Sequence, residues 1–166
     1  MALVVLTSSL IGCGGRNHAQ QEGCYALNPV RPSGIIRDEC QLLGDAAANL
    51  GAGLTVYGNL VQLEFRFSTP SQRQLLDVSM AGAFDYGEET FSADGTAANV
   101  LLPIDGQSCQ LQLVDVHLNA TTDANDQGRF SGIIRITTSA PRPETCICQA
   151  WFEYQANLSS TASVCP

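Results

Sequence analysis

Residues 54–67 read Leu-Thr-Val-Tyr-Gly-Asn-Leu-Val-Gln-Leu-Glu-Phe-Arg-Phe. Apolar and polar residues alternate from residue 60 onward, which places one set of side chains on one face of an extended chain: Val61, Leu63, Phe65 and Phe67. A period of two is that of a half-buried strand. Gly58-Asn59 lies between two such runs, as a tight turn does. The stretch therefore predicts a β-hairpin.

The same alternation recurs along most of the chain. Strand-like runs cover residues 75–84, 109–120, 128–139 and 146–158, and two more, at 88–93 and 96–104, flank the turn dipeptide Asp94-Gly95. Short strands at this spacing, without helical patterns between them, indicate an all-β chain. We expect an antiparallel meander of about eight strands that forms a β-sandwich or a lipocalin-like barrel.

The region before the hairpin is less regular. Prolines in residues 24–32 argue for an irregular lead-in. Apolar residues then recur every three or four positions, which predicts one short helix near residues 36–50. The glycines in this segment favour an alternative, a strand at residues 35–42 followed by a loop.

Composition restricts the classes of function. The length of 166 residues suits a single domain, and the 45% hydrophobic content is ordinary for a globular chain, whereas charged residues are scarce at 14% against a typical value of about 25%. A net charge of −8 argues against nucleic acid and against attraction to anionic headgroups, because both need clustered positive charge. All basic residues are arginine, so Schiff-base chemistry and a phosphate-binding P-loop lysine are excluded.

The apolar run of residues 2–12 ends in Leu10-Ile11-Gly12-Cys13. The run has the length of a signal-peptide core, is too short to span a bilayer as a helix, and is not preceded by Lys or Arg. It resembles the lipobox of bacterial lipoprotein precursors, in which the cysteine thiol receives a diacylglycerol and becomes the new N-terminus. The alternative is a buried element in which Cys13 is a core thiol.

The resemblance implies three regions: a signal peptide at residues 1–12, a lipidated flexible tether at 13–23, and one disulfide-bearing β domain at 24–166. The tether region is polar and contains glycine, which suits a flexible linker. Gly14 stands where some lipoproteins carry the Asp of inner-membrane retention. We therefore expect an outer-membrane lipoprotein of the bacterial envelope that faces the periplasm or the cell surface.

Lipidation of one of the seven cysteines would leave an even set: Cys24, Cys40, Cys109, Cys146, Cys148 and Cys165. An even set in an exported chain indicates three disulfides, although many connectivities are possible. Cys146 and Cys148 are too far apart along one strand to bond each other easily. We predict Cys24 with Cys40, Cys109 with Cys146, and Cys148 with Cys165. The spacing does not suit a zinc site, and we expect no metal.

Two patterns could carry chemistry. Asp115 and His117 share a strand face, as in half of a hydrolase triad, but no nucleophile motif accompanies them and the other histidine, His18, lies in the tether. A surface role for His117 is the preferred interpretation. Asp85, Glu88 and Glu89 could form a paired-carboxylate site, for which a solvated loop is the simpler explanation.

Residues 123–128, Asp-Ala-Asn-Asp-Gln-Gly, resemble the start of a calcium loop. Ile134 occupies the position where such a loop needs a bidentate Glu, so a polar hairpin turn is the better interpretation.

The leading functional hypothesis is a lipid-anchored envelope protein without enzymatic activity or cofactor, with a structural role or an envelope protein partner. The alternative is a carrier of an apolar small molecule, in which a closed barrel would place four aromatic residues around a cavity: Phe65, Phe67, Phe152 and Tyr154. A hydrolase that uses Asp115 and His117 is the third hypothesis.

Overall fold

The computed structural model describes residues 20–43, 49–69, 72–85, 87, 89–104, 107–140 and 146–160. The lipobox with Cys13, His18, Glu88 and Cys165 lie outside the described residues. The strands are β1 (Gly23–Pro29), β2 (Ile35–Asp38), β3 (Asn49–Tyr57), β4 (Leu60–Thr69), β5 (Gln72–Phe84), β6 (Thr90–Ile104), β7 (Gln107–Thr122), β8 (Arg129–Ser139) and β9 (Gln149–Leu158).

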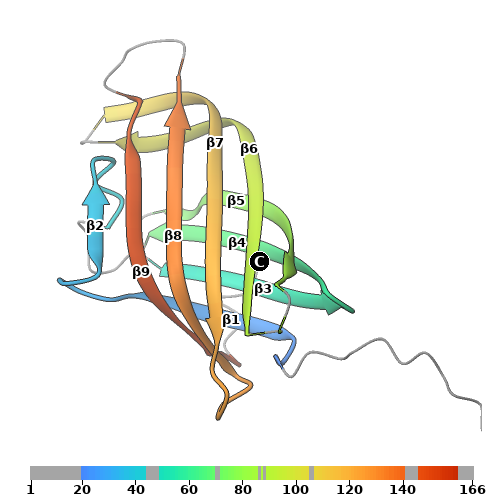
Figure 1. Cartoon of the computed structure of the whole chain (residues 1–166). Coiled ribbons are helices and arrows are strands. Elements are labelled where there is room, and N and C mark those ends of the chain that lie inside the picture. The colour runs from blue at the N-terminus through green and yellow to red at the C-terminus, as the bar shows by residue number, and fades with distance from the viewer. Residues whose placement is uncertain are drawn as a thin grey trace, which may run out of the picture.

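Eight of these strands close into an antiparallel barrel. They pair in the order β1-β3-β4-β5-β6-β7-β8-β9, and β1 also pairs with β9, which closes the ring. β2 is an extra strand that pairs with β9 outside this ring. In Figure 1 the long strands β6 to β9 stand upright and cross the layer of β1, β3, β4 and β5. The all-β prediction is confirmed, and of the two expected architectures the barrel is the observed one.

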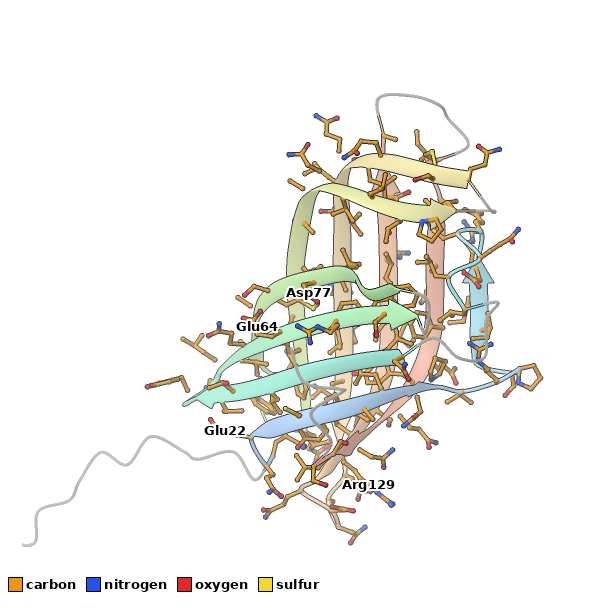
Figure 2. All side chains as sticks on the ribbon, turned by 180° about the vertical axis from the view of Figure 1, so that it is seen from behind. Glu22, Glu64, Asp77 and Arg129 are labelled. Carbon is orange, nitrogen blue, oxygen red and sulfur yellow. A yellow bond between two sulfur atoms is a disulfide. The ribbon has the colours of Figure 1, made fainter. Side chains whose placement is uncertain are left out.

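The β3–β4 hairpin forms as residues 54–67 predicted. Tyr57 pairs with Leu60 across the turn, and Gly58 has a φ of 59°, which glycine adopts at little cost. The four alternating apolar side chains, Val61, Leu63, Phe65 and Phe67, are at most 2% exposed. The polar positions between them, such as Glu64, lie on the outer face, beside Asp77 of β5 (Figure 2).

The irregular lead-in predicted for residues 24–32 is wrong, because Gly23–Pro29 forms β1. Tyr25 and Leu27 are buried, and Pro29 stands at the strand end, where a missing N–H is tolerated. β1 pairs with β3 along one edge and with β9 along the other. A short strand with little alternation of its own thus supplies the closure of the barrel.

The helix predicted near residues 36–50 is also wrong. Residues 35–38 form β2 and the chain then turns, in agreement with the alternative of a strand followed by a loop. The Asp38 carboxylate accepts hydrogen bonds from the backbone N–H groups of Leu42 and Leu43, each at 2.9 Å. Gln41 has a φ of 52°, which no α-helix accommodates. These contacts hold a tight turn in place of a helix.

The hairpin turn predicted at Asp94-Gly95 is wrong as well, since both residues lie inside the continuous strand β6. They pair with Ala81 and Met80 on one side. A Cβ atom built on Gly95 would stand 2.5 Å from the Ser79 carbonyl oxygen. Glycine is therefore needed at this position for the close approach of β5 and β6. The strand continues past Gly95 and ends at Ile104.

Candidate functional site

The interior of the barrel is filled by its own side chains. The four residues of the carrier hypothesis, Phe65, Phe67, Phe152 and Tyr154, are 1%, 2%, 0% and 1% exposed. Phe130 packs against Tyr154, with a distance of 6.0 Å between the ring centroids. Its ring centroid also lies 4.7 Å from that of Tyr25 and 5.3 Å from that of Phe91. These contacts are those of a packed aromatic core.

Tyr154 carries the polar group of this core. Its hydroxyl donates a hydrogen bond to the Asn119 carbonyl at 3.1 Å. Burial raises the pKa of Tyr154 well above its ordinary value, and burial also raises the pKa of Tyr25. The cause is the cost of placing a phenolate in a medium of low polarity.

A pH dependence of stability follows from these pKa shifts. Below pH about 10 tyrosine is neutral in both the folded and the unfolded chain, so the contribution of Tyr154 to stability is complete. At higher pH the unfolded chain loses the proton first, and stability falls as pH rises. The urea concentration needed to unfold the wild type is expected to fall above pH about 10. The fall should be smaller in Tyr154→Phe. Tyr57→Phe is the control, because Tyr57 is 81% exposed; an equal effect of both variants would contradict this explanation.

One end of the barrel is cross-linked by disulfides. Cys109 bonds Cys146, as predicted, whereas Cys40 bonds Cys148. The predicted pairs Cys24–Cys40 and Cys148–Cys165 are therefore wrong. Residues 39–43 turn back toward the start of β9, which brings Cys40 to Cys148. Cys24 is also disulfide-bonded, and its partner lies outside the described residues.

Thr138 links the two cross-linked cysteines before β9. Its buried hydroxyl donates to the Cys146 carbonyl at 2.7 Å and accepts from the Cys148 backbone N–H at 2.9 Å. Both backbone groups are thereby satisfied in a segment that has not yet joined the sheet. The hydroxyl fixes the spacing at which Cys146 and Cys148 reach two different partners.

His117 does lie on the same outer face as Asp115, but the two are not partners. The Nδ1 atom of His117 is 2.6 Å from Oδ1 of Asp94, and Asp115 accepts a hydrogen bond from the Thr96 hydroxyl at 2.7 Å. Within the described part of the chain, no serine or cysteine side chain bonds His117. The arrangement lacks the nucleophile that a hydrolase of this type needs.

His117 belongs to a cross-strand row on the outside of the barrel, which we name the outer row. It consists of paired positions on β6, β7, β8, β9 and β2: Asp94, His117, Arg135, Trp151 and Arg37. The Cζ atom of Arg135 stands 4.7 Å from the Trp151 ring centroid, a cation–π contact. Arg37 pairs with Glu39 at 3.4 Å, while Arg135 makes no ion pair with any residue that the structure describes.

The outer row offers hydrogen-bond groups to a binding partner. The Nε2 atom of His117 makes no hydrogen bond to a described protein group, and the guanidinium of Arg135, which contacts the Trp151 ring, makes no hydrogen bond or ion pair with one. A guanidinium that rests on an aromatic ring is held in place with its N–H groups directed outward. Sequence reasoning identified His117 but missed Asp94, Arg135 and Trp151, because cross-strand partners depend on a register that the alternation alone does not give.

A groove of about 440 Å³ lies beside the outer row, over β3 to β6. Its lining includes Asp94, together with the following residues of the other strands: Thr55, Tyr57, Leu60, Val61, Gln62, Ser79, Met80, Ala81 and Gly82. The small residues Ala81 and Gly82 of β5 leave room for this groove. A second, more polar hollow of about 480 Å³ lies by the β7–β8 turn and is bordered by Asp123, Arg129 and Gln155.

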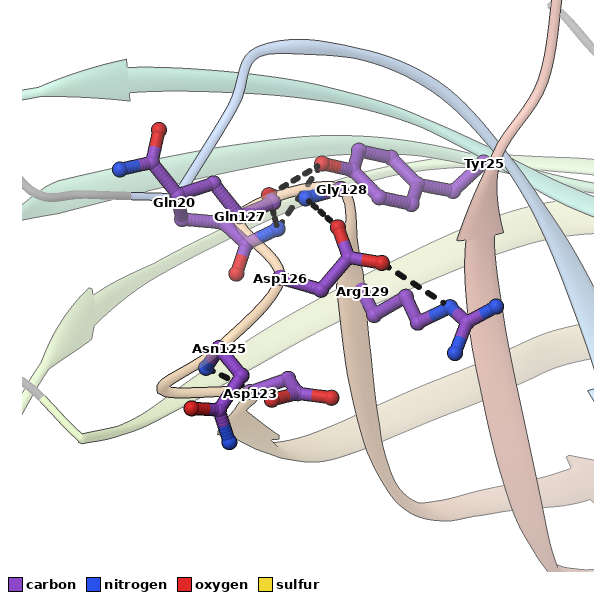
Figure 3. Close-up of polar contacts among 8 residues, drawn as sticks. All are labelled: Gln20, Tyr25, Asp123, Asn125, Asp126, Gln127, Gly128 and Arg129. Atoms are coloured by element: carbon purple, nitrogen blue, oxygen red, sulfur yellow. Dashed lines mark hydrogen bonds and ion pairs between the residues drawn. The ribbon is translucent and has the colours of Figure 1, made fainter.

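The calcium-like segment 123–128 is a hairpin turn, as the sequence favoured. Asp123 accepts a hydrogen bond from the Asn125 N–H, and Asp126 accepts one from the Gly128 N–H, each at 2.9 Å (Figure 3). Asp126 also pairs with Arg129 at 3.2 Å. Both carboxylates thus stabilise the turn locally. Among the described residues no group of three or more acidic, His or Cys side chains is placed to hold a metal ion.

The same turn anchors the beginning of the described chain. The amide nitrogen of Gln20 donates to the Gln127 carbonyl at 2.6 Å and to the Tyr25 hydroxyl at 2.8 Å (Figure 3). Gln20 is only 6% exposed. Residues 20–23, which we assigned to the tether, therefore pack against the barrel.

The acidic residues between β5 and β6 do not form a paired-carboxylate site among the described atoms. Asp85 accepts a hydrogen bond from the Thr90 hydroxyl at 2.6 Å. Glu89 contributes its backbone carbonyl, which accepts the Thr122 N–H at 2.8 Å. These bonds connect the loop to the ends of β6 and β7.

No family model, no curated protein and no solved structure matches this chain. No helix in the described ranges has the length and apolar character needed to cross a membrane.

Proposed function

We propose that this protein is an exported, lipid-anchored envelope protein whose barrel binds a partner protein through its outer face. The observation that carries the proposal is the oxidation state of the cysteines. Each of the five cysteines that the structure describes, Cys24, Cys40, Cys109, Cys146 and Cys148, is disulfide-bonded. Disulfides persist in exported proteins and are rare in the cytosol, where thiols are kept reduced. This supports export, and the lipobox supports anchoring through Cys13.

A binding role for the outer face is supported by two observations, one on the barrel interior and one on its surface. The barrel interior is packed with aromatic side chains, which leaves the carrier alternative with less support. The outer row presents the Nε2 atom of His117 and the guanidinium of Arg135, neither of which makes a hydrogen bond to a described residue. Arginine and tryptophan are the residue types enriched where protein partners bind most strongly. We place the partner-binding face on β7, β8 and β9.

Cysteine pairing makes the proposal testable. Four of the described cysteines pair with each other, so the partner of Cys24 is either Cys13 or Cys165. A lipidated Cys13 cannot form a disulfide. We therefore expect a disulfide between Cys24 and Cys165.

The test is intact mass analysis of the protein purified from membranes, with and without reductant, followed by a non-reduced peptide map. The expected result is a chain that begins at an acylated Cys13, contains three disulfides and yields a peptide pair joining Cys24 and Cys165. Cys13→Ala is the control and should remain unacylated while it keeps these disulfides. A peptide pair joining Cys13 and Cys24 would overturn the anchoring proposal.

A further inference from the structure

The turn between β3 and β4 carries the most exposed large apolar side chains in the described part of the protein. Tyr57 is 81% exposed and Leu60 is 63% exposed. They pair across the two-residue turn, so their side chains project to the same side of the hairpin. Nothing lies within 4 Å of a Cβ built on Gly58, so the space beside this residue is open. We name residues 57–60 the β3–β4 tip.

The apolar surface of the tip continues onto the barrel. The groove of about 440 Å³ begins at Tyr57 and Leu60 and extends over Ala81 and Gly82 of β5. Isolated apolar residues on a surface are ordinary, but a contiguous patch that includes a groove marks an interaction surface. The tip needs an occupant that accepts an aromatic ring and a branched aliphatic side chain together.

The beginning of the described chain lies beside this tip. The Glu22 carboxylate accepts a hydrogen bond from the backbone N–H of Val56 at 2.8 Å, and Gly23 pairs with Leu54. Figure 2 shows Glu22 at the end of the barrel toward which the β3 arrow points. The described chain thus first contacts the barrel at Gln20, which bonds the β7–β8 turn, and passes beside the neighbour of Tyr57 two residues later, at Glu22.

The distance from this point to the lipidated residue is short. Cys13 precedes Gln20 by seven positions, 20 minus 13. A fully extended chain of that length reaches roughly 25 Å at about 3.5 Å per residue. An anchored Cys13 would thus hold Gln20 within this distance of the bilayer. The tip, beside which the chain passes at Glu22, would then be at a high local concentration near the membrane.

We propose that the β3–β4 tip docks onto the bilayer that holds the lipid anchor, with Tyr57 and Leu60 in the interfacial region. This inference rests on the proposed function, because the anchor brings the tip to the membrane. Tyrosine is enriched at membrane interfaces, since its ring is apolar and its hydroxyl can stay hydrated. Two side chains bind a membrane weakly alone, and a second signal on the same chain makes such binding stable.

The charges around the tip indicate which kind of lipid headgroup it can approach. Asp85 follows Phe84, whose N–H donates to the Asn59 carbonyl at 2.8 Å, so this acid lies next to the turn. Glu22 lies on the other side, bonded to Val56. Acidic neighbours are repelled by anionic headgroups. The tip therefore fits a zwitterionic surface, and added anionic lipid is expected to weaken the docking.

The experiment uses single-tryptophan variants of the full chain, because Trp151 is the only native tryptophan. Trp151→Phe combined with Leu60→Trp places the fluorophore at the tip. The matched control combines Trp151→Phe with Ile147→Trp; Ile147 is 53% exposed and precedes β9 at the disulfide end. Each protein is reconstituted in phosphatidylcholine vesicles with and without brominated acyl chains, which quench tryptophan on contact.

The expected result is that brominated lipid removes most of the emission in the Leu60→Trp protein and leaves that of the Ile147→Trp protein nearly unchanged. Anionic lipid should restore part of the lost emission. Equal quenching of the two proteins, or none in either, would overturn the docking. So would an emission shift that depends on protein concentration and not on brominated lipid, because that result assigns the tip to a second copy of the chain. Acylation is read separately by mass, so failure of the anchor and failure of the docking are distinguishable.

Discussion

Replacement of Cys40 and Cys148 together by alanine is expected to lower the free energy of unfolding by about 2 to 5 kcal/mol, the usual range for a lost native disulfide. This bond joins residues 108 positions apart, and constraint of the unfolded chain grows with loop length. It also holds the segment of β2, which pairs only with β9 and lies outside the closed ring. The loss of local stability should therefore be largest around residues 35–43.

Urea unfolding, followed by far-ultraviolet circular dichroism, measures this loss. The comparison is Cys109→Ala with Cys146→Ala, which opens a loop of 37 positions between strands that the barrel already holds. We expect the Cys40–Cys148 variant to be the less stable of the two, with faster amide exchange in β2. A smaller effect than that of the Cys109–Cys146 variant would show that β2 does not depend on its cross-link.

Phe130→Ala is expected to cost about 3 to 5 kcal/mol, the range for removal of a fully buried aromatic side chain. Phe130 is 2% exposed and contacts the rings of Tyr25, Phe91 and Tyr154. Those three residues belong to β1, β6 and β9, so the ring connects distant parts of the barrel wall. The cavity left by its removal cannot close without movement of several strands.

Thermal and urea unfolding of Phe130→Ala should show this loss, with Leu113→Ala as the control. Leu113 is also on a long strand but is 39% exposed, and its truncation should cost about 1 kcal/mol or less. If Phe130→Ala were as mild as Leu113→Ala, the interior around Phe130 would hold empty space, and the carrier alternative would regain support.

The sequence predicted the regular strands well because one face of each is buried. In β9, Ala150, Phe152 and Tyr154 face the core and Glu153 faces solvent, as the alternation indicated. β4 and β8 follow the same rule. Each of these patterns reflects a local property, the period of two that extended backbone imposes on its side chains.

The errors share a different cause. Asp94-Gly95 has the composition of a turn, but Gly95 is needed for close packing of β5 on β6, and Asp94 bonds His117 of β7. The helical spacing after residue 36 is overridden by Asp38 and by the bond from Cys40 to Cys148. The Asp38 contacts are local, whereas the contacts of Gly95, Asp94 and Cys40 join residues distant in sequence and outweigh the local preference.

The candidate site shows the same division. The sequence placed His117 on an outer strand face and favoured a surface role for it, but its partner Asp94 is 23 residues away. Arg135 and Trp151 lie on different strands, and their contact exists only because β8 and β9 pair in one register. A shift of one residue would reverse the face of every side chain on a strand.

The sequence by itself determined that the chain is all-β and which side chains of its long strands are buried. These properties follow from residues that are neighbours along the chain. Only the tertiary structure decided that the sheet closes through β1, that Cys40 meets Cys148, and which side chains form the outer row. The reason is physical: closure and cross-strand contacts depend on the relative register of strands, and local periodicity carries no information about register between distant segments.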